Sequence, residues 1–293
     1  MLQMNSTQKI YYTLRIAIAM CFIGHGAFGI ITKPIWCNYF GVVGIDHDLA
    51  YKLMPWVGSF DILMGFLMLV FPMRIIALWL VIWGLITASM RPLSGEPFAE
   101  LIERAGNFGA PLAMLVLVGI NKDFRNIFKP IIPDIHDNLK TLRQVKTCLR
   151  IVVFLLLAGH GWLNLVEKKA LLSQYTALGF SNPSRTALLV GIFEIATAFA
   201  ILVKPARPLL FALFIWKSTS ELFYPHYGLF EWIERGGSYG ALLALWFATE
   251  KTSYHDKLKN INLLLKEKIF RGLGNNKGLG LFVALLSLLP VVN

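Results

Sequence analysis

The stretch LRIAIAMCFIGHG at residues 14–26 occurs a second time, as LRIVVFLLLAGHG at residues 149–161. Both copies are apolar over a helix-length segment and end in Gly-His-Gly. The correspondence continues downstream, where GSFD matches GIFE and the pattern E-x-I-E-R-x-G-x-x-G occurs in both halves. The chain is therefore a tandem duplication of a unit that we predict to contain four helices. Because four is even, both copies should have the same orientation in a membrane, related by an axis along its normal.

Residues 24–29, GHGAFG, also match the G-x-G-x-x-G pattern of dinucleotide-binding proteins. That pattern has a mechanical meaning only between a strand and a helix of a soluble βαβ unit, whereas apolar residues flank it here on both sides. The second copy reads GHGWLN and lacks the third glycine. We interpret the glycines as small residues that let a neighbouring helix approach while the histidine finds a polar partner.

The composition is typical of an integral membrane protein. Of the 293 residues, 56% are hydrophobic and 15% are charged, and the mean hydropathy is +0.60. An ordinary soluble domain is about 45–50% apolar. The three cysteines, Cys21, Cys37 and Cys148, have neither a C-x-x-C motif nor metal-ligand spacing, which argues against a dithiol centre.

We predict an all-α polytopic membrane protein with eight transmembrane helices, arranged as two tandem parallel four-helix bundles. The predicted spans are residues 12–31, 53–71, 74–90, 105–120, 148–166, 186–203, 207–224 and 237–249. The predicted domains are a first four-helix unit at 1–120, a linker at 121–147, a second unit at 148–249 and a tail at 250–293. An apolar run at 279–292 is short for a crossing and is a possible ninth, partial segment.

The net charge of +11 is distributed unevenly between the loops. If the N-terminus is cytoplasmic, nineteen of the 28 Lys and Arg residues lie on the inner side and eight on the outer side. This distribution predicts a multi-pass plasma (inner) membrane protein with a cytoplasmic N-terminus, and it does not require a nucleic-acid partner. The linker and residues 255–270 combine lysines with an apolar stripe, so we expect amphipathic helices on the anionic inner leaflet.

Several of these features together resemble the DoxX-like family. They are an Arg at the start of the first span, an apolar run into His-Gly, a G-x-x-E/D motif in the second span, and a Pro or Lys-Pro turn with Arg. The likeness covers about residues 14–120 and 149–249, one family unit in each half. The fused duplication and the basic tail after residue 249 depart from the family pattern.

The resemblance implies site residues and activities as well as a fold. The family's His-Gly corresponds to His25 and His160, and its acidic position corresponds to Asp61 and Glu194; the Asp in the first copy is a further departure. Members of the family are associated with thiosulfate:quinone oxidoreduction, with membrane redox assemblies and with maturation of other proteins. Because one fold serves such different activities, the likeness bears on fold more than on function.

Ionisable side chains inside membrane spans are costly and therefore mark candidate sites. At 1.5 Å per residue, His25 and Asp61 have similar depths in the outer half of the bilayer, as do His160 and Glu194. We expect a pair of a His and a carboxylate in each half. The imidazole of such a pair can donate a hydrogen bond to a quinone carbonyl or relay a proton. A paired polar group that only holds two helices together is the alternative.

The second half carries an additional charged pair, Lys217 and Glu221, where the first half has Gly84 and Ala88. Lys217 can form an ion pair with Glu221, one helical turn away. Alternatively, it can pair with Glu194, and Glu221 then faces the outer opening near His226. This difference leads us to expect function in the second half, with a structural charge network as the alternative. Candidates for an outer rim precede the fourth helix of each unit: Glu103, Arg104, Glu234 and Arg235.

The sequence favours, as function, binding of a quinone or similar amphipathic molecule within a redox-linked membrane system. Alternatives are a non-catalytic assembly factor or scaffold for a membrane partner, and a small-molecule transporter; the absence of clearly broken helices weakens the latter. No Cys/His cluster predicts zinc. A bis-His haem on His25 and His160 would have to lie on the pseudo-twofold axis, which argues against haem.

Overall fold

The computed structural model describes residues 4–119, 124–133, 137–223 and 228–250. Its regular secondary structure is helical throughout these ranges. Contacts divide the chain into a compact unit of residues 1–249, described below, and a C-terminal unit. The predicted helix at 255–270, the apolar run at 279–292 and the placement of His226 lie outside the described residues.

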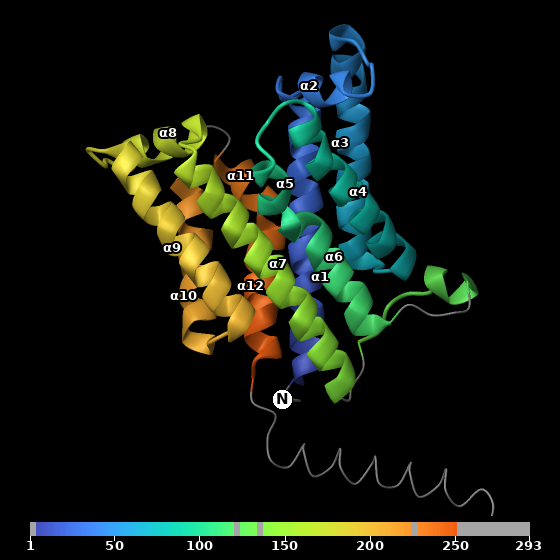
Figure 1. Ribbon diagram of the computed structural model, residues 1–293. Helices are drawn as coiled ribbons and strands as arrows, with labels where there is room; N and C mark the ends of the chain where they lie inside the picture. Colours follow the sequence, from blue (N-terminus) through green and yellow to red (C-terminus); the bar gives the residue numbers. More distant parts are fainter. Residues whose placement is uncertain (1–3, 120–123, 134–136, 224–227, 251–293) are drawn as a thin grey trace, which may run out of the picture. The chain divides into compact units, whose positions relative to one another are not determined.

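Each half contains four main helices and two shorter ones, joined by short turns (Figure 1). The first half comprises α1 (Ser6–Ile30), α2 (Trp36–Gly41), α3 (His47–Val70), α4 (Arg74–Leu93), α5 (Ala99–Glu103) and α6 (Ala105–Val118). The short 3-10 helix η1 (Phe124–Phe128) follows. The second half comprises α7 (Leu139–Leu165), α8 (Lys169–Ala177), α9 (Pro183–Val203), α10 (Arg207–Ser220), η2 (Glu221–Phe223), α11 (Gly228–Glu234) and α12 (Gly236–Ala248).

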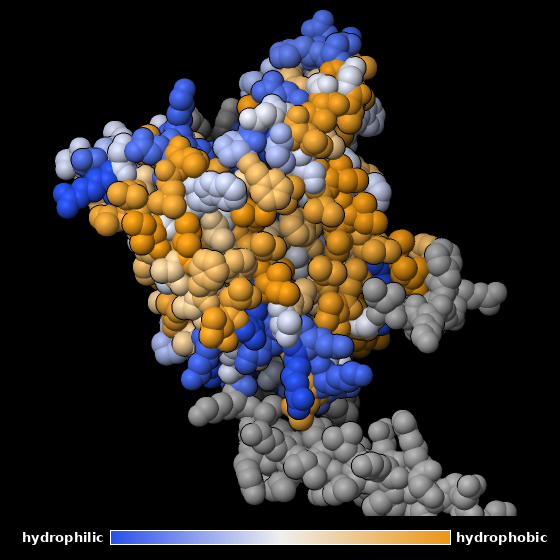
Figure 2. Space-filling view, in the orientation of Figure 1, coloured by the Kyte–Doolittle hydropathy of each residue, from blue (hydrophilic) through white to orange (hydrophobic). Residues whose placement is uncertain are grey.

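Five helices, α1, α3, α4, α7 and α9, are long and apolar enough to cross a membrane. Figure 2 shows a broad hydrophobic band on the molecule with hydrophilic residues above and below it. The predicted all-α membrane fold is confirmed at this level. The helices α6, α10 and α12 have 14, 14 and 13 residues, which at about 1.5 Å per residue is less than a bilayer core of about 30 Å.

In each half a shorter helix precedes the fourth helix, and the interruption between the two lies directly before the predicted spans 105–120 and 237–249. In the first half α5 ends at Glu103 and α6 begins at Ala105, with Arg104 between them. In the second half Arg235 separates α11 from α12 in the same way. Both arginine side chains pair with buried carboxylates, Arg104 with Glu100 and Glu103, and Arg235 with Glu103 and Glu221.

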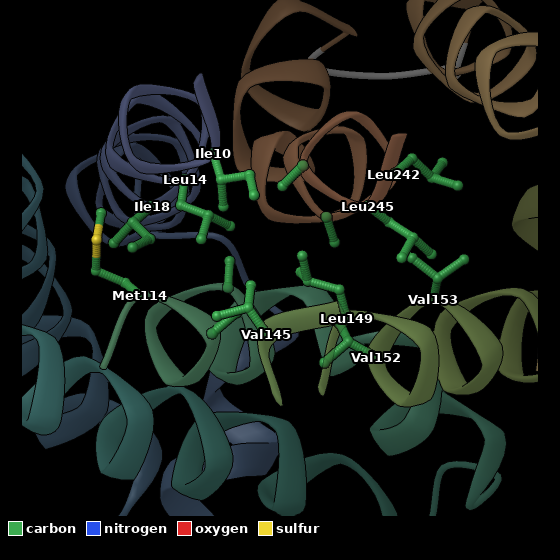
Figure 3. Packing of buried hydrophobic residues seen from close by; sticks show 14 of the residues in the cluster. Ile10, Leu14, Ile18, Met114, Val145, Leu149, Val152, Val153, Leu242 and Leu245 are labelled. Atoms are coloured by element: carbon green, nitrogen blue, oxygen red, sulfur yellow. The ribbon is translucent and has the colours of Figure 1, made fainter. Parts of the chain in front are cut away.

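The two halves interlock through their first and fourth helices. Helix α1 packs most extensively against α3 of its own half and α12 of the other, and α7 packs against α9 and α6. The main core lies among α1, α6, α7 and α12, where Leu14, Leu149 and Leu245 are among the buried side chains (Figure 3). The outer helices α3, α4 and α9 are buried to a smaller extent than α1 and α7.

Glycines permit the close helix approaches of this core. Gly26 on α1 faces Gly58 on α3, where a Cβ on either residue would collide with the other's backbone oxygen. Gly24 lies against the backbone of Glu234 in α11, and its equivalent Gly159 lies against the backbone of Glu103 in α5. The interpretation of Gly-His-Gly as a helix-packing motif is confirmed, because its two glycines contact two different neighbouring helices.

Equivalent residues of the two halves make equivalent contacts at the same end of the unit. Arg15 donates to the carbonyl oxygens of Met68 and Leu69, the last turn of α3. Arg150 donates to those of Leu202 and Val203, the last turn of α9. These contacts satisfy helix C-terminal carbonyl groups that have no partner within their helix.

The end of the predicted linker is not a separate surface helix. Residues from Leu139 onward form the first turns of α7, and Leu142 and Val145 are buried in the main core. Their helical spacing arises from packing against the other core helices rather than from contact with an inner leaflet. Ile135, which shares this spacing, lies outside the described residues.

Candidate functional site

The first half contains the predicted pair of His25 and Asp61. His25 Nδ1 lies 2.8 Å from Asp61 Oδ2, joining α1 to α3. Trp83 on α4 donates its indole N–H to Asp61 Oδ1 at 2.7 Å. Asp61 is fully buried, whereas His25 remains partly accessible and stacks against Trp36 at 4.7 Å between ring centroids. Three helices therefore hold the carboxylate and the imidazole in one orientation.

A cavity of about 190 Å³ lies directly beside this pair. Its wall is mostly apolar and aromatic, with Trp36, Tyr39, Phe40 and Trp83 among the lining side chains. The polar residues that line it are His25, Thr87, Arg91, Arg104, Asn107 and Glu234. An apolar cavity with a few convergent polar groups is the usual form of a small-molecule site.

The second half contains the corresponding pair in a different environment. His160 Nδ1 lies 2.5 Å from Glu194 Oε2, and its Nε2 lies 4.0 Å from Glu221. Lys217 Nζ is 3.6 Å from Glu194 and 3.2 Å from Glu221, so this ammonium group lies between two carboxylates. All four side chains are buried.

The second half has less open space beside its histidine. A cavity of about 60 Å³ lined by His160, Tyr175 and Trp216 is present there. The first half has Gly84 and Ala88 at the positions of Lys217 and Glu221, and so lacks two long side chains in this region. The structure therefore shifts the candidate ligand site from the second half, where the sequence placed it, to the first.

The predicted outer-rim residues form part of a buried ionic cluster. Arg104 Nη1 donates to Glu103 at 2.8 Å and to Glu100 at 2.6 Å. Arg235 from the other half donates to Glu103 at 2.6 Å and lies 3.1 Å from Glu221. Glu103 and Glu234 are only 7% and 6% exposed, so they lie within the protein rather than on a rim.

Two reciprocal ion pairs connect the halves at the same end of the unit. Lys33, directly after α1, lies 2.6 Å from Glu231 in the second half. Its equivalent Lys168, after α7, lies 2.5 Å from Glu100 in the first half. An inverted repeat would place such equivalent residues at opposite ends, so the contacts agree with two copies in one orientation.

Glu100 is strongly stabilised in its charged form. Burial alone would raise the pKa of its carboxyl group, but nearby Arg104, Lys168 and Arg91 outweigh burial and lower this pKa to about 2. Burial lowers the pKa of the Lys168 ammonium group, an effect that Glu100 opposes.

Glu234 differs from its counterpart Glu103. Glu103 has two arginine partners, whereas the Glu234 side chain has no hydrogen-bond or ion-pair partner among the described residues. It is nevertheless buried, and it lines the cavity beside His25. Its negative charge is stabilised at a distance by Arg104 and Lys33, and its oxygen atoms remain available as acceptors at the cavity, which distinguishes this position as a functional candidate.

Several site residues were missed in the sequence. The aromatic residues Trp36 and Tyr39 come from the short helix α2, which no span prediction includes. The ion pairs that Lys33 and Lys168 make with the other half could have been predicted from the repeat. Both lysines occupy the same position in it, and both of their glutamate partners begin the shared E-x-I-E-R pattern. Within the described ranges, no group of three or more His, Cys, Asp or Glu side chains is arranged to hold a metal ion.

Comparisons with known proteins give no further assignment, since no family model, curated protein or solved structure matches the chain.

Proposed function

We propose that the chain is a DoxX-like integral membrane protein that binds a quinone or a similar amphipathic small molecule beside His25, as a component of a redox-linked membrane system. The observation that carries this proposal is the aromatic cavity in which the accessible edge of His25, held by the buried Asp61, meets apolar walls. Trp36 and Trp83 offer flat faces for a ring, and the polar residues at one end can bind its oxygen atoms.

The proposed topology has eight crossings and a cytoplasmic N-terminus. The helices α6 and α12 contribute the fourth and eighth crossings, in the predicted spans 105–120 and 237–249, and α5 and α11 precede them on the outer side. The excess of inner Lys and Arg supports this orientation. Reporter tags at residue 1 and after residue 250 should both be cytoplasmic, and an external signal from either would contradict it.

Ligand binding can be tested with the full chain in lipid nanodiscs. Decylbenzoquinone should quench tryptophan fluorescence, because two of the lining residues are tryptophans. Val57→Phe places extra volume in the cavity and should weaken binding about tenfold or more, whereas Leu63→Phe on the exposed face of the same helix should leave it unchanged. Equal binding by both variants would show that this cavity is not the site.

A transporter is the second candidate, and the interrupted helices favour it. Arg104, at the break between α5 and α6, lines the cavity directly. Interrupted helices with a binding site at the break are typical of secondary transporters. Uptake of a labelled quinone into proteoliposomes can be compared between the unmodified chain and Val57→Phe. Uptake that the variant reduces would indicate transport, and equal uptake would indicate binding alone.

A further inference from the structure

The hydrogen bonds around Asp61 assign the tautomer of His25. A carboxyl group is a much stronger acid than an imidazole or indole N–H, so Asp61 is the acceptor for both. Its Oδ1 accepts from Trp83 and its Oδ2 accepts from His25 Nδ1. His25 Nδ1 therefore carries a hydrogen, and in the neutral imidazole Nε2 is an acceptor. No polar atom among the described residues is bonded to this Nε2.

The second acceptor at the cavity is the carboxylate of Glu234. The close approach of Gly24 to the Glu234 backbone brings α11 against α1 one residue before His25. Both side chains line the same cavity, and Glu234 has no partner among the described residues. The two groups therefore present acceptors to whatever occupies the space, and a ligand must supply the donors.

The wall of the cavity disfavours a cationic donor, because it is mostly apolar and moving an ammonium group from water into it is costly. Arg91 and Arg104 also line the cavity, and both are paired with carboxylates. Asn107 is neutral and can pair with either a donor or an acceptor. The aromatic side chains Trp36, Tyr39 and Trp83 favour a flat ring.

We propose that the cavity selects a neutral aromatic hydroxyl compound, a phenol or a hydroquinone, whose O–H donates to the Glu234 carboxylate, with His25 Nε2 as a second acceptor. The inference rests on the proposed function and specifies its ligand: the hydroxyl-bearing, reduced form of the ring is bound in preference to a form that has only carbonyl or ether oxygens. No bond to the ligand is made or broken in this recognition.

The test uses three probes that do not undergo redox chemistry under the conditions of the assay. Para-pentylphenol carries one O–H donor, para-pentylanisole replaces that hydrogen by a methyl group, and para-pentylbenzylamine is a cation. With the full chain in nanodiscs, the phenol should bind about tenfold or more tightly than the anisole, since the O–H donates to a charged or buried acceptor. The amine should bind more weakly than the phenol.

Two variants test whether Glu234 causes the preference for the phenol over the anisole. Glu234→Gln replaces an acceptor-only group by an amide and should reduce the phenol-to-anisole ratio about tenfold without weakening the anisole. Glu231→Gln is the matched control on the same helix, because Glu231 pairs with Lys33 and does not line the cavity. Its ratio should equal that of the unmodified chain.

The other outcomes overturn the inference in distinguishable ways. If decylbenzoquinone binds but the phenol shows no preference over the anisole, the proposed function stands and the donor requirement is wrong. Tightest binding of the amine would identify a cation site instead. If neither the quinone nor any of the three probes binds, the proposed function itself fails, and this inference with it.

Discussion

At the scale of single residues, Lys217 shows how the two histidine pairs differ. It lies between Glu194 and Glu221 in an almost fully buried position. Lys217→Met leaves both carboxylates without this partner, and removing one member of a buried ionic group costs about 3–5 kcal/mol. We expect a large fall in the denaturation temperature of the detergent-solubilised chain, measured by a thermal-shift assay.

The double variant Lys217→Met with Glu194→Gln provides the control. Removing a carboxylate together with the cation should restore part of the lost stability, because fewer buried charges remain uncompensated. Asp61→Asn should cost less than Glu194→Gln, since the first half has no buried lysine at the position of Gly84. An additive loss in the double variant would contradict the charge network.

Glu100 predicts a pH dependence of stability. Its pKa is lowered from 4.5 to about 2 in the folded protein, so its stabilising contribution is complete above pH 4.5 and is lost as the pH falls toward 2. The difference in denaturation temperature between the unmodified chain and Glu100→Gln should therefore be large at neutral pH and shrink between pH 4.5 and 2. A difference that is independent of pH over this range would show that the carboxylate is not the titrating group.

The sequence could predict which polar residues pair within a half but not what surrounds each pair. Repeat alignment and depth place His25 with Asp61 and His160 with Glu194, and both contacts are confirmed. The cavity beside His25 depends on the side chains of α2, α6 and α11, which are distant in the sequence. The sequence shows the charge of Lys217 but not the open space, so it favoured the second half, whereas the larger cavity lies in the first.

At the scale of helices, the contact between α1 and α3 depends on two facing glycines. Gly26→Ala inserts a methyl group toward the backbone of Gly58, which cannot move without separating the helices. Overpacking of this kind costs about 1–3 kcal/mol, so we expect a lower folded yield on size-exclusion chromatography. Gly41→Ala is the control, because a Cβ there has no neighbour within 4 Å among the described residues. A normal yield for both variants would show that the helices can separate freely.

The helices were predictable as elements, but their ends and partners were not. Each of the eight predicted spans overlaps a helix of the structure, because long apolar runs favour helices in a membrane. The interruption at Arg235 has a signal in the pair Gly236 and Gly237 that follows it, whereas Arg104 is followed by Ala105 and a single Gly106. The ionic cluster that accompanies them joins residues from both halves, so one half of the sequence does not reveal it.

At the scale of the whole unit of residues 1–249, the interlock predicts that neither half is stable alone. Residues 1–120 expressed by themselves would expose the faces of α1 and α6 that pack against α12 and α7. We expect little folded protein from either half, and co-purification of a tagged first half with residues 121–293 when both are produced together. Recovery of each half as a stable, separate species would contradict the interlocked arrangement.

The exchange of ion pairs between the halves has a consequence for the origin of the chain. A gene encoding one repeat would yield a subunit whose Lys33 and Glu100 equivalents find partners only on a second subunit, so the ancestral protein would be an obligate homodimer with two identical cavities. After gene fusion the two copies no longer had to share one sequence. The two copies could then differ, so that one has Gly84 and Ala88 and an open cavity, where the other has the buried charged pair of Lys217 and Glu221.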